Sequence, residues 1–291
     1  MSLKGFEMLK VLIWRVSDDT SFQDKAIKIL EQQHDGIDII GEASDADIAK
    51  VDRAYDLILV VGAKKIGMSK ITQTAHKLNL PEEKLLSDRI VCTPGFTLDK
   101  YRHLQRSQLS IIAMNCFGGL ISNILDLPFR TPIINMFFEE QDYLRFLRDP
   151  RLYMSEQPIL KETRWQTVLK FDYPVVTFGD VDIYMNHYRD FGEAVAKWNE
   201  RKARINWYNL FVTMYTEDEK ILEQFDALPY GKKACFVPFK SDLDSAWYIN
   251  REITKKKYFW QTINDFAKGI PFYYDPFDML LYGKKTPLIE M

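Results

Sequence analysis

Hydrophobic residues in the first third of the chain follow two alternating spacings. Short aliphatic runs, which predict buried strands, occur at residues 9–14, 37–41 and 56–61. Apolar side chains recur at helical spacing between and after them, at residues 24–33 and 68–78. Because strands that alternate with helices usually form a parallel sheet with helices on its faces, this order predicts a Rossmann-like domain.

The boundary of this domain is predicted where the alternation stops. Residues 90–92 read as a last short strand, and residues 93–108 then combine Pro94 and Gly95 with a run of charged side chains. Such composition is typical of a junction between domains. We therefore expect one domain over residues 1–105 and a second over residues 106–291.

The same alternation resumes in the second part of the chain. Buried-strand patterns occur at residues 133–138, 173–178, 208–215 and 233–237, and helical patterns at residues 143–148, 190–204 and 217–228. The predicted fold is therefore two three-layer α/β/α Rossmann-like domains with mostly parallel sheets.

A strand-turn-helix joint is predicted at residues 109–125, S-I-I-A-M-N-C-F-G-G-L-I-S-N-I-L-D. Gly118 and Gly119 would let the backbone approach a ligand closely beside Asn115, and the free N–H groups of the first helical turn attract a phosphate. The alternative is that the two glycines only permit close packing of the helix on the sheet. Cys116 is a candidate nucleophile, because a helix N-terminus lowers the pKa of a thiol; the alternative is an inert buried cysteine.

Two aspartates follow another predicted strand, in F-G-D-V-D at residues 178–182. Carboxylates spaced like Asp180 and Asp182 can share a divalent cation that holds the diphosphate of a sugar nucleotide. Turn and helix-capping roles are the alternative. His187 is a candidate general base nearby, or else a structural histidine, and no second histidine completes a metal site.

The helix predicted at residues 190–204 is the most basic stretch of the chain. Trp198 belongs to its apolar stripe, and we assign it to the binding site. Arg201 or Arg204 would suit a phosphate if turned toward the strand ends, because the guanidinium group donates two parallel hydrogen bonds. The alternative is an ordinary solvated helix face. The first domain lacks the G-x-G-x-x-G of dinucleotide-binding folds after its first strand, so we interpret it as a degenerate domain that serves packing or assembly.

The composition of the chain argues against several partners and sites, namely nucleic acid, disulfide or zinc clusters, and the membrane. The chain has 291 residues, 46% of them hydrophobic, and its 39 Lys and Arg residues nearly balance 41 Asp and Glu residues, so nucleic acid is not an expected partner. Three well-separated cysteines support neither a disulfide framework nor a zinc cluster, and they favour the cytoplasm. No apolar run is long enough to span a bilayer, so we expect no membrane insertion.

Many strings of the second domain, taken in order, resemble one bacterial family. They are N-C-F-G-G, L-P-F-R-T-P, D-Y-L-R-F-L, Y-P-V with D-V-D-I and H-Y, K-W-N-E-R-K-A-R-I-N, N-L-F-V and F-D-A-L-P. This part of the chain looks like the domain of unknown function nineteen-nineteen, often labelled an exopolysaccharide biosynthesis protein. The resemblance implies a role in making surface polysaccharide and brings no established reaction. Its motifs fall on Asn115, Cys116, Gly118, Gly119, Asp180, His187, Trp198, Arg201 and Asn206.

This sequence departs from the commoner family pattern at two positions. Met114 stands where a second asparagine is frequent, and Asp182 stands where glutamate is frequent. The first difference removes a polar group from the proposed site, and the second keeps the charge.

The leading functional hypothesis is a transferase that uses a nucleotide-activated or phosphorylated sugar, with a divalent cation as its expected cofactor. The donor would bind at residues 115–119, with Asp180 and Asp182 as metal ligands or catalytic carboxylates. The alternative is a non-catalytic module that binds a glycan or scaffolds other polysaccharide-assembly proteins. A third hypothesis, hydrolysis at Cys116, lacks a paired base. The leading hypothesis requires residues 115–119 and the two aspartates to meet along one edge of the same sheet.

Overall fold

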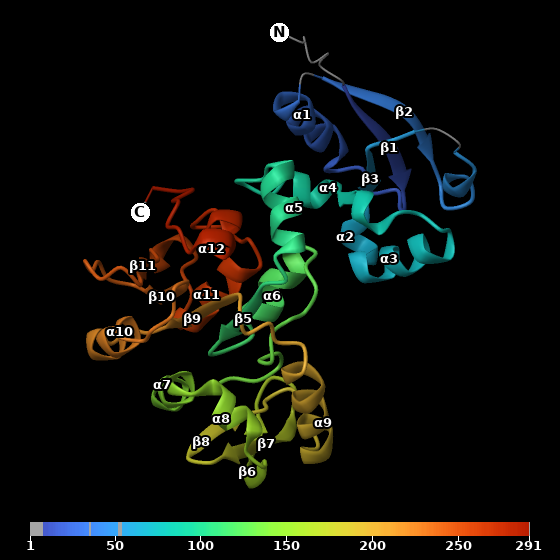
Figure 1. Cartoon of the computed structure of the whole chain (residues 1–291). Coiled ribbons are helices and arrows are strands. Elements are labelled where there is room, and N and C mark those ends of the chain that lie inside the picture. Colours follow the sequence, from blue (N-terminus) through green and yellow to red (C-terminus); the bar gives the residue numbers. More distant parts are fainter. Residues whose placement is uncertain (1–7, 35, 52–53, 291) are drawn as a thin grey trace. The chain divides into compact units, whose positions relative to one another are not determined.

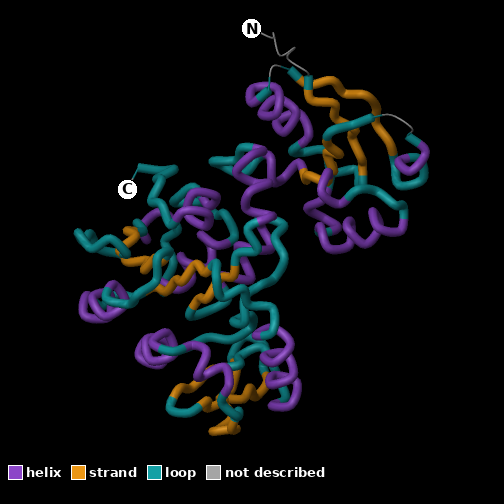
Figure 2. Tube along the Cα trace, in the orientation of Figure 1, coloured by secondary structure: helices purple, strands orange, loops and turns teal. Residues whose placement is uncertain are grey.

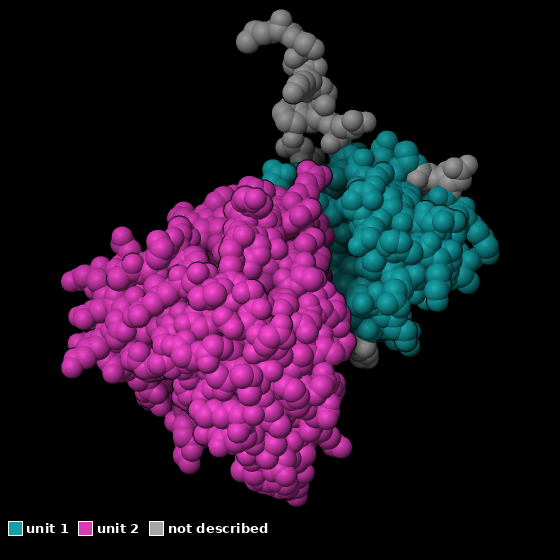
Figure 3. Space-filling view, turned by 60° about the horizontal axis from the view of Figure 1, so that its bottom comes forward, with its two compact units in different colours: residues 1–102 teal, residues 103–291 magenta. Residues whose placement is uncertain are grey.

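The computed structural model describes residues 8–34, 36–51 and 54–290, and the chain divides into two compact units. Unit 1 comprises Met1–Arg102 and unit 2 comprises His103–Met291, as coloured in Figure 3. The division falls within helix α5 (Leu98–Arg106), the helix that also contains the predicted boundary at residue 105.

Unit 1 is built on a parallel sheet, here called sheet A (Figure 1). Its four strands are, in spatial order, β2 (Ile37–Ala43), β1 (Leu9–Arg15), β3 (Leu57–Val61) and β4 (Leu85–Ser87). Leu12 and Trp14 pack against Ile71 and Ala75 of a flanking helix. The intervening Ile13 is also fully buried, so both faces of β1 are covered, as the pattern of the sequence predicted.

The helices of unit 1 connect or follow these strands. They are α1 (Gln23–Gln33), α2 (Ala63–Ile66), α3 (Met68–Lys77), α4 (Asp88–Val91) and α5, with short 3-10 helices at Ile48–Lys50 and Glu82–Lys84. The predicted strand at residues 90–92 is wrong, because residues Asp88–Val91 form a helical turn. The Ser87 hydroxyl accepts a hydrogen bond from the N–H of Ile90 (3.3 Å), and this N-cap starts a helix where the apolar run alone suggested a strand.

Unit 2 contains a second parallel sheet, sheet B. Its strands are, in spatial order, β11 (Ala246–Tyr248), β10 (Lys233–Val237), β9 (Leu210–Tyr215) and β5 (Ser110–Ala113). The strands predicted at residues 208–215 and 233–237 and the strand-turn-helix joint at residues 109–125 are confirmed. The α/β class with parallel sheets is therefore correct for both units.

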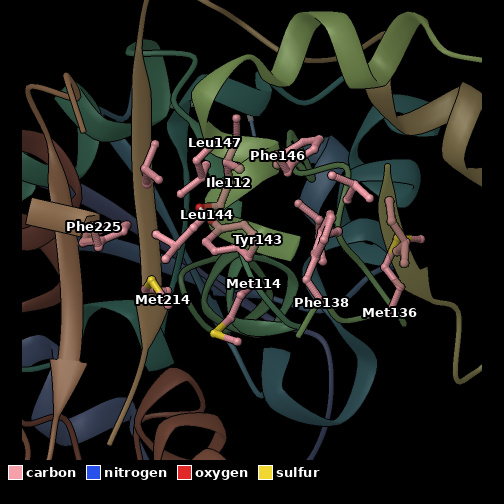
Figure 4. Packing of buried hydrophobic residues seen from close by; sticks show 14 of the residues in the cluster. Ile112, Met114, Met136, Phe138, Tyr143, Leu144, Phe146, Leu147, Met214 and Phe225 are labelled. Carbon is pink, nitrogen blue, oxygen red and sulfur yellow. Dashed lines mark hydrogen bonds between the residues drawn. The ribbon is translucent and has the colours of Figure 1, made fainter. Parts of the chain in front are cut away.

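Helices surround sheet B (Figure 1). They are α6 (Phe117–Ile124), α7 (Glu140–Arg148), α10 (Glu219–Asp226), α11 (Phe259–Ala267) and α12 (Pro276–Tyr282), with a 3-10 helix at Arg251–Ile253. Tyr143 and Leu144 of α7 point into the core beside Ile112 and Met214 of the sheet (Figure 4). The Tyr143 hydroxyl has one proton to donate, and the carbonyls of Ile112 (2.8 Å) and Thr213 (3.0 Å) share it, so this helix is fixed to two neighbouring strands. In the described part of the chain, no helix combines the length and the apolar character needed to cross a bilayer.

A third sheet, sheet C, was not predicted from the sequence. It is antiparallel, with strands in the order β6 (Ile159–Gln166), β7 (Phe171–Phe178) and β8 (Val181–Tyr184), and it is accompanied by α8 (Pro150–Ser155) and α9 (Phe191–Lys202) (Figure 2). The strand predicted at residues 173–178 is confirmed as part of β7. Strand β6 gave no signal because its side chains are exposed on both faces, so no alternation of buried and exposed positions marks it.

The segment at residues 133–138 joins the two sheets of unit 2. It was predicted as a strand, but Asn135 has a φ of 64°, which breaks the extended backbone. Only Phe137 pairs with β8, through an isolated bridge to Tyr184. The N–H of Phe138 then donates to the carbonyl of Met114 just beyond β5 (2.8 Å). The end of β5 and the edge of sheet C are therefore held together by this irregular chain segment.

Candidate functional site

The predicted joint lies at the carboxyl end of β5, where α6 begins at Phe117. The side chain of Asn115 accepts a hydrogen bond from the N–H of Phe117 (3.0 Å) and donates to the Asn264 side chain on α11 (3.3 Å). Asn115 therefore satisfies one free N–H group of α6 and ties this helix to α11. Both hydrogen bonds shape the edge of the sheet where α/β proteins bind ligands.

The two glycines of the joint pack closely against their surroundings. A Cβ atom on Gly118 would lie 2.9 Å from Thr131 Oγ1 and 3.1 Å from Ile111 Cγ2, and one on Gly119 would lie 3.3 Å from the Ile134 side chain. Both glycines are buried. This geometry supports the packing alternative: the glycines allow α6 to approach residues 131–134.

Cys116 precedes the helix, and its environment does not activate it. The thiol lies 3.9 Å from the carbonyl of Met136. Burial raises the pKa of Cys116, and this effect outweighs contacts with Asn135 and Met136 and the positive charges of Arg201 and Lys268. The thiol is therefore protonated at neutral pH, which argues against the nucleophile role.

Arg201 of α9 points toward the joint, whereas Arg204 does not. The Arg201 Nη1 donates to the carbonyl of Ile134 and to the hydroxyl of Tyr188, both at 2.6 Å. Its charge is close enough to act on Cys116. Arg204 is exposed and pairs with Glu200 on its own helix.

Trp198, which the sequence assigned to ligand binding, is a core residue. Its side chain is 1% exposed and packs on Phe178 with ring centroids 5.1 Å apart. The indole N–H has no hydrogen-bond partner among the described residues. A ligand would reach this ring only after the core around it had opened, so its predicted role in binding stays untested.

The two aspartates lie in the hairpin between β7 and β8. The Asp180 carboxylate accepts from the Tyr153 hydroxyl (2.8 Å), and the Asp182 carboxylate accepts from Thr177 Oγ1 (2.6 Å) and Lys161 Nζ (2.5 Å). Burial by itself would raise the pKa of Asp182, but the hydrogen bonds from Lys161 and Thr177 outweigh it and lower that pKa. Asp182 is therefore an ionised, internally paired carboxylate.

The expectation that the joint and the aspartates share one sheet edge is wrong. Residues 115–119 follow β5 of sheet B, whereas Asp180 and Asp182 belong to the β7–β8 hairpin of sheet C. The error arose because β7 was taken for a strand of the parallel sheet. A buried apolar run does not reveal which sheet it joins.

The hairpin does not fit a divalent cation. Both carboxylate oxygens of Asp182 are engaged by Lys161 and Thr177, and the lysine ammonium already supplies a positive charge there. The Asp180 side chain is 68% exposed. Across the described residues, no group of three or more His, Cys, Asp or Glu side chains is arranged to hold a metal ion. We therefore derive no step through a metal at these residues.

His187 lies in the turn after β8 and is exposed. Partial burial lowers its pKa, so the imidazole is neutral at pH 7. No hydrogen bond to its ring is found in the part of the chain that the structure describes. His187 thus has the protonation state of a general base without a partner that would orient it.

A pocket that sequence reasoning missed lies at the carboxyl ends of β5 and β9. Its volume is about 480 Å³, and residues from four chain segments line it. They are Met114, Phe137, Phe138, Glu139, Glu140, Gln141, Tyr215 and Trp260. The lining thus combines aromatic rings with two carboxylates.

The carboxylates of this pocket lie in an acidic environment. Burial raises the pKa of Glu140, and the negative charges of Asp218, Glu139 and Glu217 add to this effect against a hydrogen bond from Thr216. A phosphate placed beside these groups would be repelled. The pocket itself therefore favours a neutral or cationic ligand.

Helix α11 connects the pocket to the joint. Trp260, Asn264 and Lys268 are spaced four residues apart, so they lie along one side of α11 and its C-cap, Lys268. Trp260 lines the pocket, Asn264 holds Asn115, and the charge of Lys268 acts on Cys116. The acidic, aromatic pocket and a more basic region near Cys116 thus adjoin the same helix.

No spacing of residues along the sequence predicts this pocket, because the residues that line it come from distant segments. One signal was present: the acidic run at residues 139–142 was interpreted only as a favourable first turn of α7. Trp260 gave no such signal, because only the structure shows that it is 44% exposed.

Glu140 gives a test of the electrostatics of the pocket. Since the pKa of Glu140 is raised, the folded chain still binds a proton at pH values where the unfolded chain, with a pKa of about 4.3, has lost it. The free energy of unfolding contributed by Glu140 should therefore fall as the pH rises through this range and then level off. Glu140→Gln should remove that dependence in urea unfolding between pH 4 and 7.

The control for this measurement is Glu223→Gln, an exposed glutamate on α10. It should retain the pH dependence of the wild type. A Glu140→Gln variant with the wild-type pH dependence would show that the carboxyl group is not buried.

Comparison with known proteins supports one family assignment. The family described as "Domain of unknown function (DUF1919)" matches residues 89–282, which include nearly all of unit 2. An uncharacterized protein of Haemophilus influenzae is 33% identical over 153 residues, which is 51% of this chain and 71% of that protein. The N-C-F-G-G joint, the pocket and the β7–β8 hairpin all fall within the matched range. This chain belongs to the DUF1919 family.

Proposed function

We propose that this protein binds a carbohydrate during the assembly of surface polysaccharide in the bacterial cytoplasm. The sugar ring would occupy the pocket at the carboxyl ends of β5 and β9. The observation that carries this proposal is the lining of the pocket, in which Trp260 and Phe137 accompany Glu139 and Glu140.

The chemistry of these groups fits a sugar. Aromatic rings offer a flat apolar surface for the C–H face of a pyranose, and carboxylates accept hydrogen bonds from its hydroxyl groups. Trp260 is parallel to Tyr258, with an interplanar angle of 11° and centroids 6.4 Å apart, so two partly exposed rings lie together. The acidic surroundings of Glu140 favour an uncharged or amino sugar in the pocket itself.

A second candidate function is a transferase that uses a phosphorylated or nucleotide-activated sugar. The observation in its favour is the positive charge of Arg201 and Lys268 near Cys116, on the side of the pocket where α6 begins. A phosphate could bind there while the attached sugar occupied the pocket. Glu140 would be the carboxyl group available for acid-base chemistry, in place of Asp180 and His187.

Binding can be measured by calorimetry with neutral mono- and disaccharides. Trp260→Ala should weaken the binding of the best sugar at least tenfold, which corresponds to about 1.4 kcal/mol, because it removes the stacking surface. Tyr208→Ala is the matched control, because this aromatic side chain is 98% exposed and does not line the pocket. Wild-type protein that binds no sugar, or a Trp260→Ala variant that binds as the wild type does, would refute the proposal.

The transferase is distinguished by comparing each sugar with its 1-phosphate and with nucleotide sugars. A phosphate site predicts tighter binding of the phosphorylated ligands, and Lys268→Met should remove part of this gain because it deletes an exposed cation. Equal affinity for a sugar and its phosphate would rule out the transferase and support the function of a carbohydrate-binding module.

A further inference from the structure

Strand β6 is an open edge of sheet C. It is eight residues long, it pairs only with β7 among the described strands, and Figure 1 shows it at the outer end of this sheet. Ile159, Leu160 and Trp165 on it are 64%, 45% and 58% exposed. A β-bulge between Leu160 and Glu162 interrupts this edge, so its regular part is residues 162–166. Another strand can pair with this regular part of the open edge.

The direction of the backbone groups on β6 follows from its neighbours. The carbonyl of Pro174 accepts from the N–H of Met185 (3.1 Å), so Pro174 faces β8. Thr163 lies opposite Pro174 in the β6–β7 ladder. Because antiparallel strands alternate between hydrogen-bonded and non-bonded pairs, the N–H and C=O groups of Thr163 point away from β7 to the open edge. Trp165, two residues further, presents its backbone in the same direction.

The charges on either side of Thr163 have opposite signs. Glu162 precedes it and Arg164 follows it. We infer that two copies of this chain pair through β6, antiparallel, about a two-fold axis at Thr163. Thr163 then bonds to Thr163 of the second copy, each Glu162 lies opposite an Arg164, and the two copies of sheet C become one continuous sheet.

Other registers are less favourable. A residue whose backbone faces outward cannot pair with one that faces inward, so the axis must pass through a residue and not between two residues. An axis at Glu162 would oppose two glutamates, and an axis at Arg164 would oppose two arginines. Like charges directly opposite each other destabilise a strand pair, whereas opposite charges and Thr–Thr pairs stabilise it. An axis at Trp165 would pair only residues 164–166 of each strand, because β6 ends at Gln166, and an axis at Lys161 would fall on the bulge. The order of charges and the limits of the regular strand therefore select Thr163.

The charges of Glu162 and Arg164 determine the register of the two β6 strands, but they contribute little to the affinity of the dimer. Arg164 already bonds to Glu162 of its own strand at 2.6 Å and lies over the ring of Tyr184 at 5.0 Å. An exposed ion pair that only exchanges partners gains little. The driving force is the backbone pairing beside Thr163 together with the water removed from Trp165, since the bulge separates Ile159 and Leu160 from the paired residues. This inference is independent of the proposed carbohydrate binding.

The test is the oligomeric state of the full chain, measured by sedimentation equilibrium from micromolar to near-millimolar concentration. The wild type should form a dimer. Glu162→Arg and Arg164→Glu should each raise the dissociation constant about tenfold, since each places like charges opposite one another twice. The double variant E162R/R164E should restore dimerisation, because it reverses both charges and keeps them complementary.

Two further variants complete the test. Glu223→Arg makes the same charge change at an exposed position of α10 and should leave the dimer unchanged. Thr163→Pro removes an outward N–H group that the β6–β7 ladder does not use, and it should give a monomer with a normal circular dichroism spectrum. The inference is overturned by a wild type that is monomeric throughout, by single charge variants that dimerise normally, or by a double variant that stays monomeric.

Discussion

Trp198→Ala is expected to lower the free energy of unfolding by about 3–5 kcal/mol, the range typical of a large aromatic side chain removed from a core. The indole is 1% exposed and packs on Phe178. Urea unfolding followed by circular dichroism measures the change. The result would mark Trp198 as part of the packing between α9 and sheet C.

Tyr208→Ala is the matched control for this prediction. Tyr208 is 98% exposed and lies outside β6, so its removal should change the stability of the folded chain by no more than about 0.5 kcal/mol. If Trp198→Ala kept full stability and instead lost sugar binding, the original assignment of Trp198 to the binding site would be right.

Gly118→Val is expected to lower the free energy of unfolding by about 3 kcal/mol, at the upper end of the usual cost of overpacking. The first added carbon alone would lie 2.9 Å from Thr131 Oγ1 and 3.1 Å from Ile111, and the two γ-carbons would need still more room. Thermal or urea unfolding would detect this loss. It would establish that the diglycine is required for the packing of α6.

Gly231→Val is the control for this substitution. No atom lies within 4 Å of a Cβ built on Gly231, so its stability should stay close to that of the wild type. If Gly118→Val were as stable as the control but no longer bound sugar phosphates, the glycines would contact a ligand, and the packing interpretation would fail.

Much of the fold could be predicted because short-range patterns of apolar and polar residues determine many of its helices and strands. Leu12 and Trp14 alternate with Val11 and Ile13 in β1, and all four are fully buried, as expected for a strand covered on both faces. The joint before α6 was recognisable from an apolar run followed by two glycines. The strand predicted at residues 90–92 was wrong because the Ser87 side chain caps a helical turn there. This local hydrogen bond outweighed the strand preference of the apolar residues.

The candidate site was only partly predictable. Asn115 and Arg201 do lie at the carboxyl end of β5, the first by its place after the strand and the second by reaching across from α9. Asp180 and Asp182 do not, because the strand before them pairs in a different sheet. The pocket beside Trp260 could not be predicted, since no local spacing relates it to Glu140 or Met114.

By itself, the sequence determined several of the helices and buried strands, the α/β class of both units and membership of the family. These properties depend on the periodicity of apolar side chains over a few helical turns or a few strand residues. The order of residues in the chain contains this periodicity. The tertiary structure alone decided that unit 2 has two sheets, that Trp198 is internal, and that β6 has an open edge. Such properties depend on which distant segments pack together, because burial and strand pairing are set by neighbours in space and not by neighbours in the chain.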